Sequence, residues 1–155
     1  YYEKYNYNLK NLSSKNFNLI KKAAWNKTGK VKFYSPKNIE HVSHSIVNFQ
    51  NNYSIDTDFI EVDSVDFREL LQLCKNKDKN IALLKMDIEG AEIEVLEHMI
   101  SLEIFPKQVA LEYDELNFPT KLGIQRVKSS IQNLKDHGYS LVWSSGESDF
   151  LFLKN

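Results

Sequence analysis

The spacing of hydrophobic residues changes abruptly near the middle of the chain. From Ile81 to Ile88 the residues are mostly apolar, and after Gly90 apolar residues recur at the spacing of one helix face. These helix-face residues are Ile93, Leu96 and Ile100. A period of about two that changes to about 3.6 across a glycine indicates a strand, a tight turn and a helix. We therefore expect a strand–turn–helix unit over residues 81–100.

The first half of the chain shows weaker patterns around a long polar segment. Alternating apolar positions predict strands at residues 17–24, 30–34 and 59–62. A modest apolar stripe predicts a helix within residues 1–12. Residues 35–58 have no regular spacing, and a loop of this length in a compact domain is usually functional or mobile.

A capping signal predicts a helix after the third of these strands. Asp66 is followed three residues later by Glu69, which is the spacing of a capping box. The apolar face of this helix consists of Phe67, Leu70, Leu71 and Cys74. Because the single cysteine lies on that face, we expect a buried structural thiol and not a nucleophile.

The last third of the chain predicts a strand, a helix and a hairpin. The strand covers residues 109–113, and the hairpin joins residues 139–143 to residues 150–153 through a polar turn. The helix between them has one apolar face and ends at Gly138. That face consists of Ile124, Val127, Ile131 and Leu134. The order of elements predicts an α/β layer fold with a mixed sheet.

The composition is that of an ordinary globular domain. With 155 residues, we expect residues 1–155 to form a single domain. The 20 basic and 21 acidic residues give a net charge of −1, which offers no electrostatic argument for a nucleic-acid or membrane partner. The sequence has no apolar run long enough for a membrane span and no signal-peptide core at its start. With its single cysteine, these features predict a reducing compartment, the cytoplasm.

Carboxylates follow two of the expected strands. Asp87 and Glu89 come directly after the strand that begins at Ile81, and Glu112 lies in the strand at residues 109–113. Open α/β sheets place their chemistry at the carboxyl ends of strands, so these acids are candidate site residues. Acidic side chains also stabilise helix N-termini, and on that ground we interpret Glu92 as structural.

Two alternatives concern these acids and the long loop. The same three carboxylates are hard oxygen ligands suited to magnesium or calcium, but their spacing is not specific, and we expect no metal site. His41 and His44 lie in the loop and could enter a substrate site as a base, although histidines in such loops are more often solvated.

The segment at residues 84–92, LKMDIEGAE, resembles the K-[IM]-D-[IV]-E-G-[AS]-E hallmark of the FkbM family of S-adenosylmethionine-dependent methyltransferases. Other segments resemble further parts of the family pattern. They are Ala23-Ala24 followed by residues 29–34 (GKVKFY), residues 62–66 (VDSVD), and residues 109–112 (VALE). The resemblance covers nearly the whole chain and implies a partial Rossmann-like class I methyltransferase sheet, mostly parallel with an antiparallel C-terminal hairpin.

The resemblance also implies a function and roles for particular residues. It implies S-adenosyl-L-methionine as cofactor and methyl transfer to a hydroxyl of a sugar, a glycan or a secondary metabolite. Asp87 and Glu112 would line the methyl-transfer site, and Glu89 would position the acceptor or the turn. The implied cofactor-binding residues are Ala23, Ala24 and Asp87. The implied acceptor-binding residues are His41, His44 and Glu89.

The chain departs from the family pattern at its start. The family's first strand, with its D-x-G-A-N-x-G loop, and its second strand do not precede Tyr1. We therefore expect the chain to be the C-terminal part of a methyltransferase domain. The strand at residues 17–24 would then lack a partner, and the strand at residues 81–86 would be an open sheet edge.

Two other function classes remain open at this stage. The chain could be a non-catalytic α/β module that binds a partner through its exposed strand edge. It could also be a carbohydrate-binding domain in which Trp143 or Tyr113 stacks on a sugar. Aromatic residues at such positions are more often part of the core, so we expect both to be buried.

Overall fold

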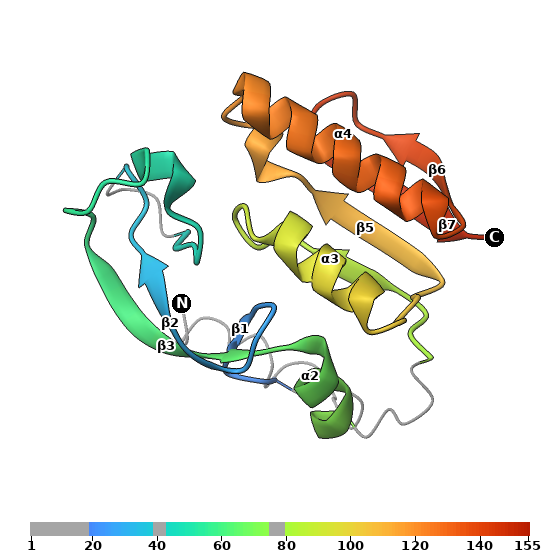
Figure 1. The fold of residues 1–155 in the computed structure, drawn as a ribbon, viewed down its shortest axis with the longest axis horizontal. Helices are drawn as coiled ribbons and strands as arrows, with labels where there is room; N and C mark the ends of the chain where they lie inside the picture. Colours follow the sequence, from blue (N-terminus) through green and yellow to red (C-terminus); the bar gives the residue numbers. More distant parts are fainter. Residues whose placement is uncertain (1–18, 39–42, 75–79) are drawn as a thin grey trace, which may run out of the picture.

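The computed structural model, which describes residues 19–38, 43–74 and 80–155, contains two β-sheets (Figure 1). The first sheet has the order β1-β3-β2. Its strands are β1 (Ala23–Ala24), β2 (Gly29–Tyr34) and β3 (Phe59–Val65). β1 runs parallel to β3, and β2 runs antiparallel to it. Helix α2 (Phe67–Leu73) follows β3, and the Asp66 side chain caps it by accepting a 2.9 Å hydrogen bond from Glu69 N, as the capping box predicts.

The second sheet holds the central part of the chain and has the order β4-β5-β7-β6. Its strands are β4 (Leu84–Met86), β5 (Gln108–Glu112), β6 (Tyr139–Ser144) and β7 (Asp149–Lys154). β4 and β5 are parallel, whereas β7 is antiparallel to both of its neighbours. Helices α3 (Glu92–Ser101) and α4 (Lys121–Asp136) lie side by side over one face of this sheet (Figure 1).

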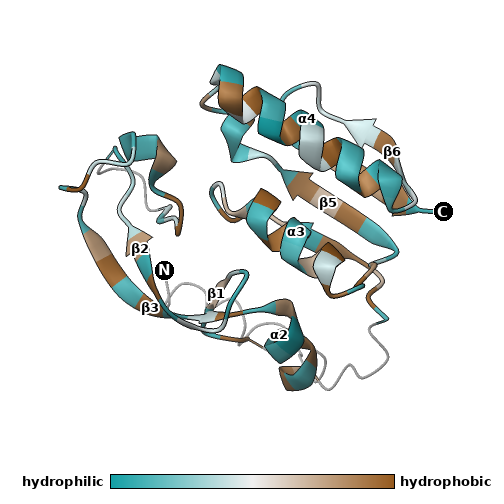
Figure 2. Ribbon diagram, in the orientation of Figure 1, coloured by the Kyte–Doolittle hydropathy of each residue, from teal (hydrophilic) through white to brown (hydrophobic). Residues whose placement is uncertain are grey.

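The core lies between this sheet and the two helices. Ile93, Leu96 and Ile100 of α3 are buried, as their helical spacing predicts, and they belong to one cluster with residues of β5 and β7. The middle of β5 is hydrophobic and its two ends are polar (Figure 2). The strand–turn–helix predicted for residues 81–100 is therefore confirmed, because its two periodicities match the two sides of this core.

Two short 3₁₀ turns bring polar segments to the carboxyl ends of β4 and β5. η1 (Asn48–Asn51) lies in the segment predicted as a long loop, and η2 (Asp114–Leu116) directly follows β5.

The predicted hairpin at the end of the chain is confirmed as β6 and β7. Among the helices that the structure describes, none is long and apolar enough to cross a membrane.

The prediction of a mostly parallel sheet is wrong. Among the described strands, two neighbouring pairs are parallel and three are antiparallel. The reason is that β2 and β3 pair with each other as an antiparallel ribbon in a sheet of their own. The predicted strand at residues 17–24 includes two residues outside the described part, and only Ala23–Ala24 is a strand. It does have a partner, β3, which corrects that expectation.

The structure confirms some of the other predictions and contradicts others. The open edge is confirmed, since β4 is the first strand of its sheet and pairs with β5 alone among the described strands. Cys74 is exposed, not buried, because it is the C-cap residue where α2 ends. Trp143 is 55% exposed, because β6 is the opposite edge strand, whereas Tyr113 is fully buried as expected and so offers no stacking face. The helix predicted at residues 1–12 lies outside the described residues.

Candidate active site

The turn after β4 is held by a buried carboxylate. Glu92 at the start of α3 is fully buried, and its two carboxylate oxygens accept hydrogen bonds from Ile88 N at 2.8 Å and Gly90 N at 3.0 Å. These are backbone donors that the turn would otherwise leave without partners. Burial raises the pKa of Glu92 to about 8. This geometry supports the structural interpretation of Glu92.

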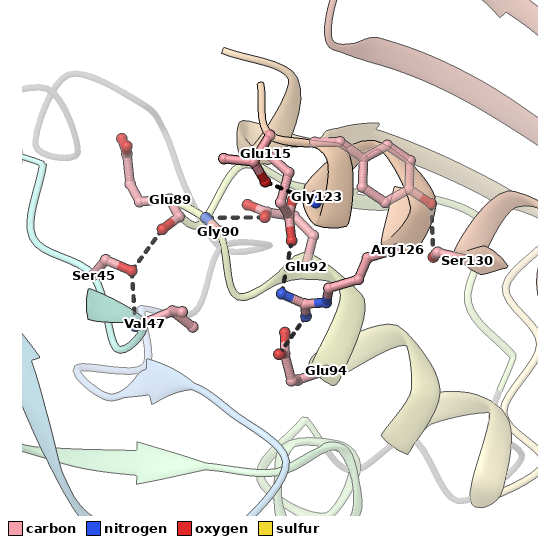
Figure 3. Close-up of polar contacts among 12 residues, drawn as sticks. Ser45, Val47, Glu89, Gly90, Glu92, Glu94, Glu115, Gly123, Arg126 and Ser130 are labelled. Carbon is pink, nitrogen blue, oxygen red and sulfur yellow. Dashed lines mark hydrogen bonds and ion pairs between the residues drawn. The ribbon is translucent and has the colours of Figure 1, made fainter. Parts of the chain in front are cut away.

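The same turn uses an uncommon backbone conformation at two consecutive residues. Glu89 has φ 60° and Gly90 has φ 94°, both in the left-handed region. A side chain on Gly90 would also collide with the ring of Phe49. The Ser45 hydroxyl donates a 2.6 Å hydrogen bond to the Glu89 carbonyl oxygen and accepts one from Val47 N (Figure 3). The segment before η1 therefore stabilises the turn that positions the Glu89 side chain.

The end of β5 is organised by amide side chains. Asn117 Nδ2 donates to Glu112 Oε1 and to Asp114 Oδ1, each at 3.1 Å. Gln50 Nε2, from η1, donates to Asp114 Oδ2 at 3.2 Å. Because η1 and η2 are joined in this way, the long loop packs against the ends of both parallel strands.

Four carboxylates gather at these strand ends, and we call them the acidic edge: Asp87, Glu89, Glu112 and Asp114. Asp87 is half exposed and lies 3.6 Å from Lys85 Nζ. Glu89 is half-buried, and its burial raises the pKa of its carboxyl. The negative charges of the other three acids raise that pKa further, while a hydrogen bond from Ser43 opposes the shift. The structure thus places Asp87 and Glu112 near enough to Glu89 for their charges to act on its carboxyl.

The other predicted site residues that the structure describes belong to β1 and to the segment between β2 and η1. Ala23 and Ala24 form β1 and pair with β3, in the sheet that does not contain Asp87. His44 is half-buried and stacks on Phe33 with ring centroids 5.8 Å apart, and its Nε2 lies 3.4 Å from Ser35 Oγ. His44 precedes Ser45, so it is adjacent in sequence to a residue that contacts the central turn. His41 lies outside the described residues.

A cavity of about 820 Å³ lies next to the acidic edge. It is lined from η1 by Phe49 and Gln50, and from the segment after β5 by Glu115 and Phe118. The rings of Phe49 and Phe118 meet edge to face with centroids 6.0 Å apart. Arg126 of α4 completes this part of the lining. Gln50 lines the cavity and also donates to Asp114, so it connects the cavity to the acidic edge.

Glu115 and Arg126 form an incomplete ion-pair network in that cavity (Figure 3). Arg126 Nη2 donates to Glu94 Oε1 at 2.6 Å, whereas Arg126 Nη1 lies 3.5 Å from Glu115 Oε1. Glu115 is 6% exposed, and neither of its carboxylate oxygens has a hydrogen-bond partner among residues 19–38, 43–74 and 80–155. Burial raises the pKa of the Glu115 carboxyl, and the nearby Arg126 guanidinium opposes that shift.

Sequence reasoning missed both of these residues. Glu115 directly follows Asp114 after β5, so the strand-end rule that selected Glu112 could also have selected Glu115. Arg126 had no comparable signal, because a basic residue on an amphipathic helix is usually solvated.

Within the described part of the chain, no three His, Cys, Asp or Glu side chains are arranged to hold a metal ion, so the magnesium or calcium alternative gains no support.

Comparison with known proteins gives one match. The family model described as the Methyltransferase FkbM domain matches residues 2–141. No curated protein and no solved structure matches the chain. The matched residues include the turn after β4, the acidic edge, and the parts of η1, η2 and α4 that line the cavity.

Proposed function

Because the chain belongs to the FkbM methyltransferase domain family, we propose that it acts in S-adenosylmethionine-dependent O-methylation. The acceptor in this proposal is a hydroxyl group of a sugar, a glycan or a secondary metabolite. The observation that supports it most directly is the convergence of Asp87, Glu89 and Glu112 at the carboxyl ends of two parallel strands. That is where open α/β sheets hold ligands.

The carboxylates of the acidic edge are chemically suited to a positively charged cofactor. S-adenosylmethionine, when bound, supplies a methyl group on a positively charged sulfonium. A set of carboxylates, in which burial and the negative charge of the neighbours raise the pKa of Glu89, is an environment that favours a cation. In this proposal Asp87, at the end of β4, faces the cofactor, and Glu112 approaches from the neighbouring strand.

The carboxylates also provide for the proton that the reaction releases. As the oxygen–methyl bond forms, the sulfur–methyl bond breaks, and the acceptor hydroxyl must give up its proton. Glu89 is the best suited to take it, because burial raises the pKa of its carboxyl above its ordinary value and makes it a stronger base. Asp87 is half exposed and would orient the hydroxyl by accepting its hydrogen bond.

The experiment replaces one carboxylate at a time in the full-length protein. Asp87→Asn and Glu89→Gln keep the shape of each side chain and remove its charge, so each should lower kcat by about 10²-fold or more with the natural acceptor. Glu147→Gln is the matched control, because Glu147 is an exposed carboxylate in the β6–β7 turn and its charge is not among those that shift the pKa of Glu89. Turnover in Asp87→Asn close to that of the control would contradict the role assigned to Asp87.

Cofactor binding needs a separate measurement. Calorimetric titration of S-adenosylhomocysteine should give a measurable dissociation constant with the full-length protein. Failure of that titration with a folded protein would contradict the proposal at its first step. Binding that persists in Glu89→Gln while turnover falls would assign Glu89 to the chemical step and not to cofactor binding.

A further inference from the structure

We propose that the cavity between η1 and the start of α4 binds a ligand through a protonated amine, which donates hydrogen bonds to Glu115. An apolar part of the same ligand would lie against Phe49 and Phe118. The cavity, with a volume of about 820 Å³, has the size of a small-molecule site.

The first argument is the state of the Glu115 carboxylate. A buried polar group without a hydrogen bond costs about 1–3 kcal/mol, and more when it is charged. Glu115 is 6% exposed, and neither oxygen has a hydrogen-bond partner among the described residues. In the described part of the chain the cation beside it is Arg126, whose Nη1 lies 3.5 Å from Glu115 Oε1 without forming a hydrogen bond. A ligand that donates hydrogen bonds from inside the cavity would supply what Glu115 lacks.

The second argument is the balance of charge around Arg126. Four carboxyl groups influence one another here: Glu92, Glu94, Asp114 and Glu115. Arg126 is bound closely to Glu94, at 2.6 Å, so its charge is already shared. The remaining imbalance favours a cation over a neutral donor at Glu115, because opposite charges attract more strongly in a poorly hydrated site.

The positive groups near the cavity do not reverse this preference. Lys37 lies at the exposed rim of the cavity. At the start of α4, Gly123 N already donates to Thr120 Oγ1 at 2.9 Å, so this donor is not available to an anion. Lys37 could instead pair with a negative group at the outer end of a ligand.

The aromatic wall gives the ligand a second point of contact. Phe49 and Phe118 meet edge to face, and Phe118 is 52% exposed. Aromatic faces attract both apolar groups and ammonium groups, with about 0.5–2 kcal/mol for the latter. The claim that this ligand is the methyl acceptor rests on the function proposed above. The claim that an amine binds in the cavity does not rest on it.

The test compares three ring compounds of nearly equal shape and different charge: benzylamine, benzyl alcohol and benzoate. Each is titrated into the full-length protein while amide chemical shifts are followed by NMR. We expect benzylamine to shift residues that line the cavity and to bind at least about tenfold more tightly than the other two. Equal binding of benzyl alcohol, tighter binding of benzoate, or no binding of benzylamine would each overturn the proposal.

Two variants locate the amine. Glu115→Gln should weaken benzylamine binding by at least about tenfold and change benzyl alcohol binding by less than about twofold. Glu147→Gln, an exposed control, should change neither. Phe118→Ala removes an exposed ring, so it should fold normally and weaken benzylamine binding several-fold. An unchanged benzylamine affinity in a folded Glu115→Gln protein or in Phe118→Ala would contradict the proposal.

A pH series on the unaltered protein gives a result that needs no variant. Benzylamine stays protonated between about pH 4 and about pH 8, so a change in affinity reports the protein. Among residues 19–38, 43–74 and 80–155, the charged groups near Glu115 or lining the cavity are Glu92, Glu94, Asp114, Arg126 and Lys37. Because the pKa of Glu115 is raised, affinity should increase with pH as its carboxyl ionises. An affinity for benzylamine that stays constant or falls with pH would overturn the proposal of an amine site. The proposed methyl transfer would still stand in that case, provided that the protein binds S-adenosylhomocysteine.

Discussion

Ser45 donates a 2.6 Å hydrogen bond to the carbonyl oxygen of Glu89, across 44 positions of sequence. Glu89 is a non-glycine residue with φ 60°, a conformation that costs free energy unless its surroundings hold it. The bond therefore couples the loop before η1 to the conformation of the turn that carries the acidic edge. A change at Ser45 should therefore reach the turn after β4.

Ser45→Ala should lower the free energy of unfolding by about 1–2 kcal/mol. The variant removes the donor to Glu89 and the acceptor of Val47 N, and Ser45 is buried, so water does not readily replace them. Urea unfolding measures the change. Ser101→Ala is the control, because Ser101 is exposed and its hydroxyl bonds only to the helix carbonyl of His98. An equal effect of the two substitutions would contradict the coupling.

Gly90→Ala should cost more than Gly146→Ala. Both glycines have φ near 90°, with 94° at Gly90 and 87° at Gly146, so both variants carry the backbone strain of a left-handed residue. A side chain at Gly146 meets nothing within 4 Å, whereas one at Gly90 meets the Phe49 ring. We expect the difference in unfolding free energy to be about 1–3 kcal/mol.

The collision can be separated from the strain in a double variant. Phe49→Ala removes the ring that a methyl group at position 90 would meet. The added cost of Gly90→Ala should therefore fall, in that background, to about the cost of Gly146→Ala. An added cost that stays high would show that the ring is not the cause.

Unfolding free energy should fall as pH rises from about 4.5 to about 8. The pKa of Glu92 in the folded protein is about 8, above its ordinary value of 4.5, so the folded state binds the proton more tightly. This stabilisation is complete below about pH 4.5 and is lost as pH rises through the folded pKa. The pKa values of Glu89 and Glu115 are raised in the same direction. Urea unfolding at several pH values measures the slope, which reaches at most about 1.4 kcal/mol per pH unit for each group.

Glu92→Gln should reduce that pH slope and also lower stability at every pH. The amide nitrogen of glutamine cannot accept a hydrogen bond, so one of the two donors, Ile88 N or Gly90 N, loses its partner. Glu147→Gln, at an exposed position, should leave the slope unchanged. A slope that is the same in Glu92→Gln and in the unaltered protein would contradict the assignment to Glu92.

Arg126→Met should lower the unfolding free energy by about 1–3 kcal/mol. The substitution keeps most of the side-chain length and leaves Glu94 and Glu115 without their shared cation. The estimate lies below that of a fully buried pair because the Arg126 side chain is 30% exposed. Arg68→Met on the exposed face of α2 is the control, with an expected change within about 0.5 kcal/mol. Thermal or urea unfolding distinguishes the two.

The sequence by itself determined the elements whose causes are local. The change of period around Gly90 specified β4, its turn and α3, and the Asp66–Glu69 pair specified the start of α2. The terminal hairpin follows from two apolar runs joined by a polar turn. In each case the deciding interactions join residues a few positions apart, so the pattern along the chain contains them. The LKMDIEGAE segment also indicated the family that the comparison shows.

Only the tertiary structure decided how these elements meet. The separate β1-β3-β2 sheet, the Ser45–Glu89 bond and the Gln50–Asp114 bond join residues far apart in sequence. The exposure of Cys74 and Trp143 likewise depends on where α2 ends and which strand forms the sheet edge. Among the described residues, the Glu115 carboxylate accepts no hydrogen bond, because Arg126, eleven residues later, lies closer to Glu94 on another helix. Long-range packing sets burial and charge balance, and no local spacing encodes them.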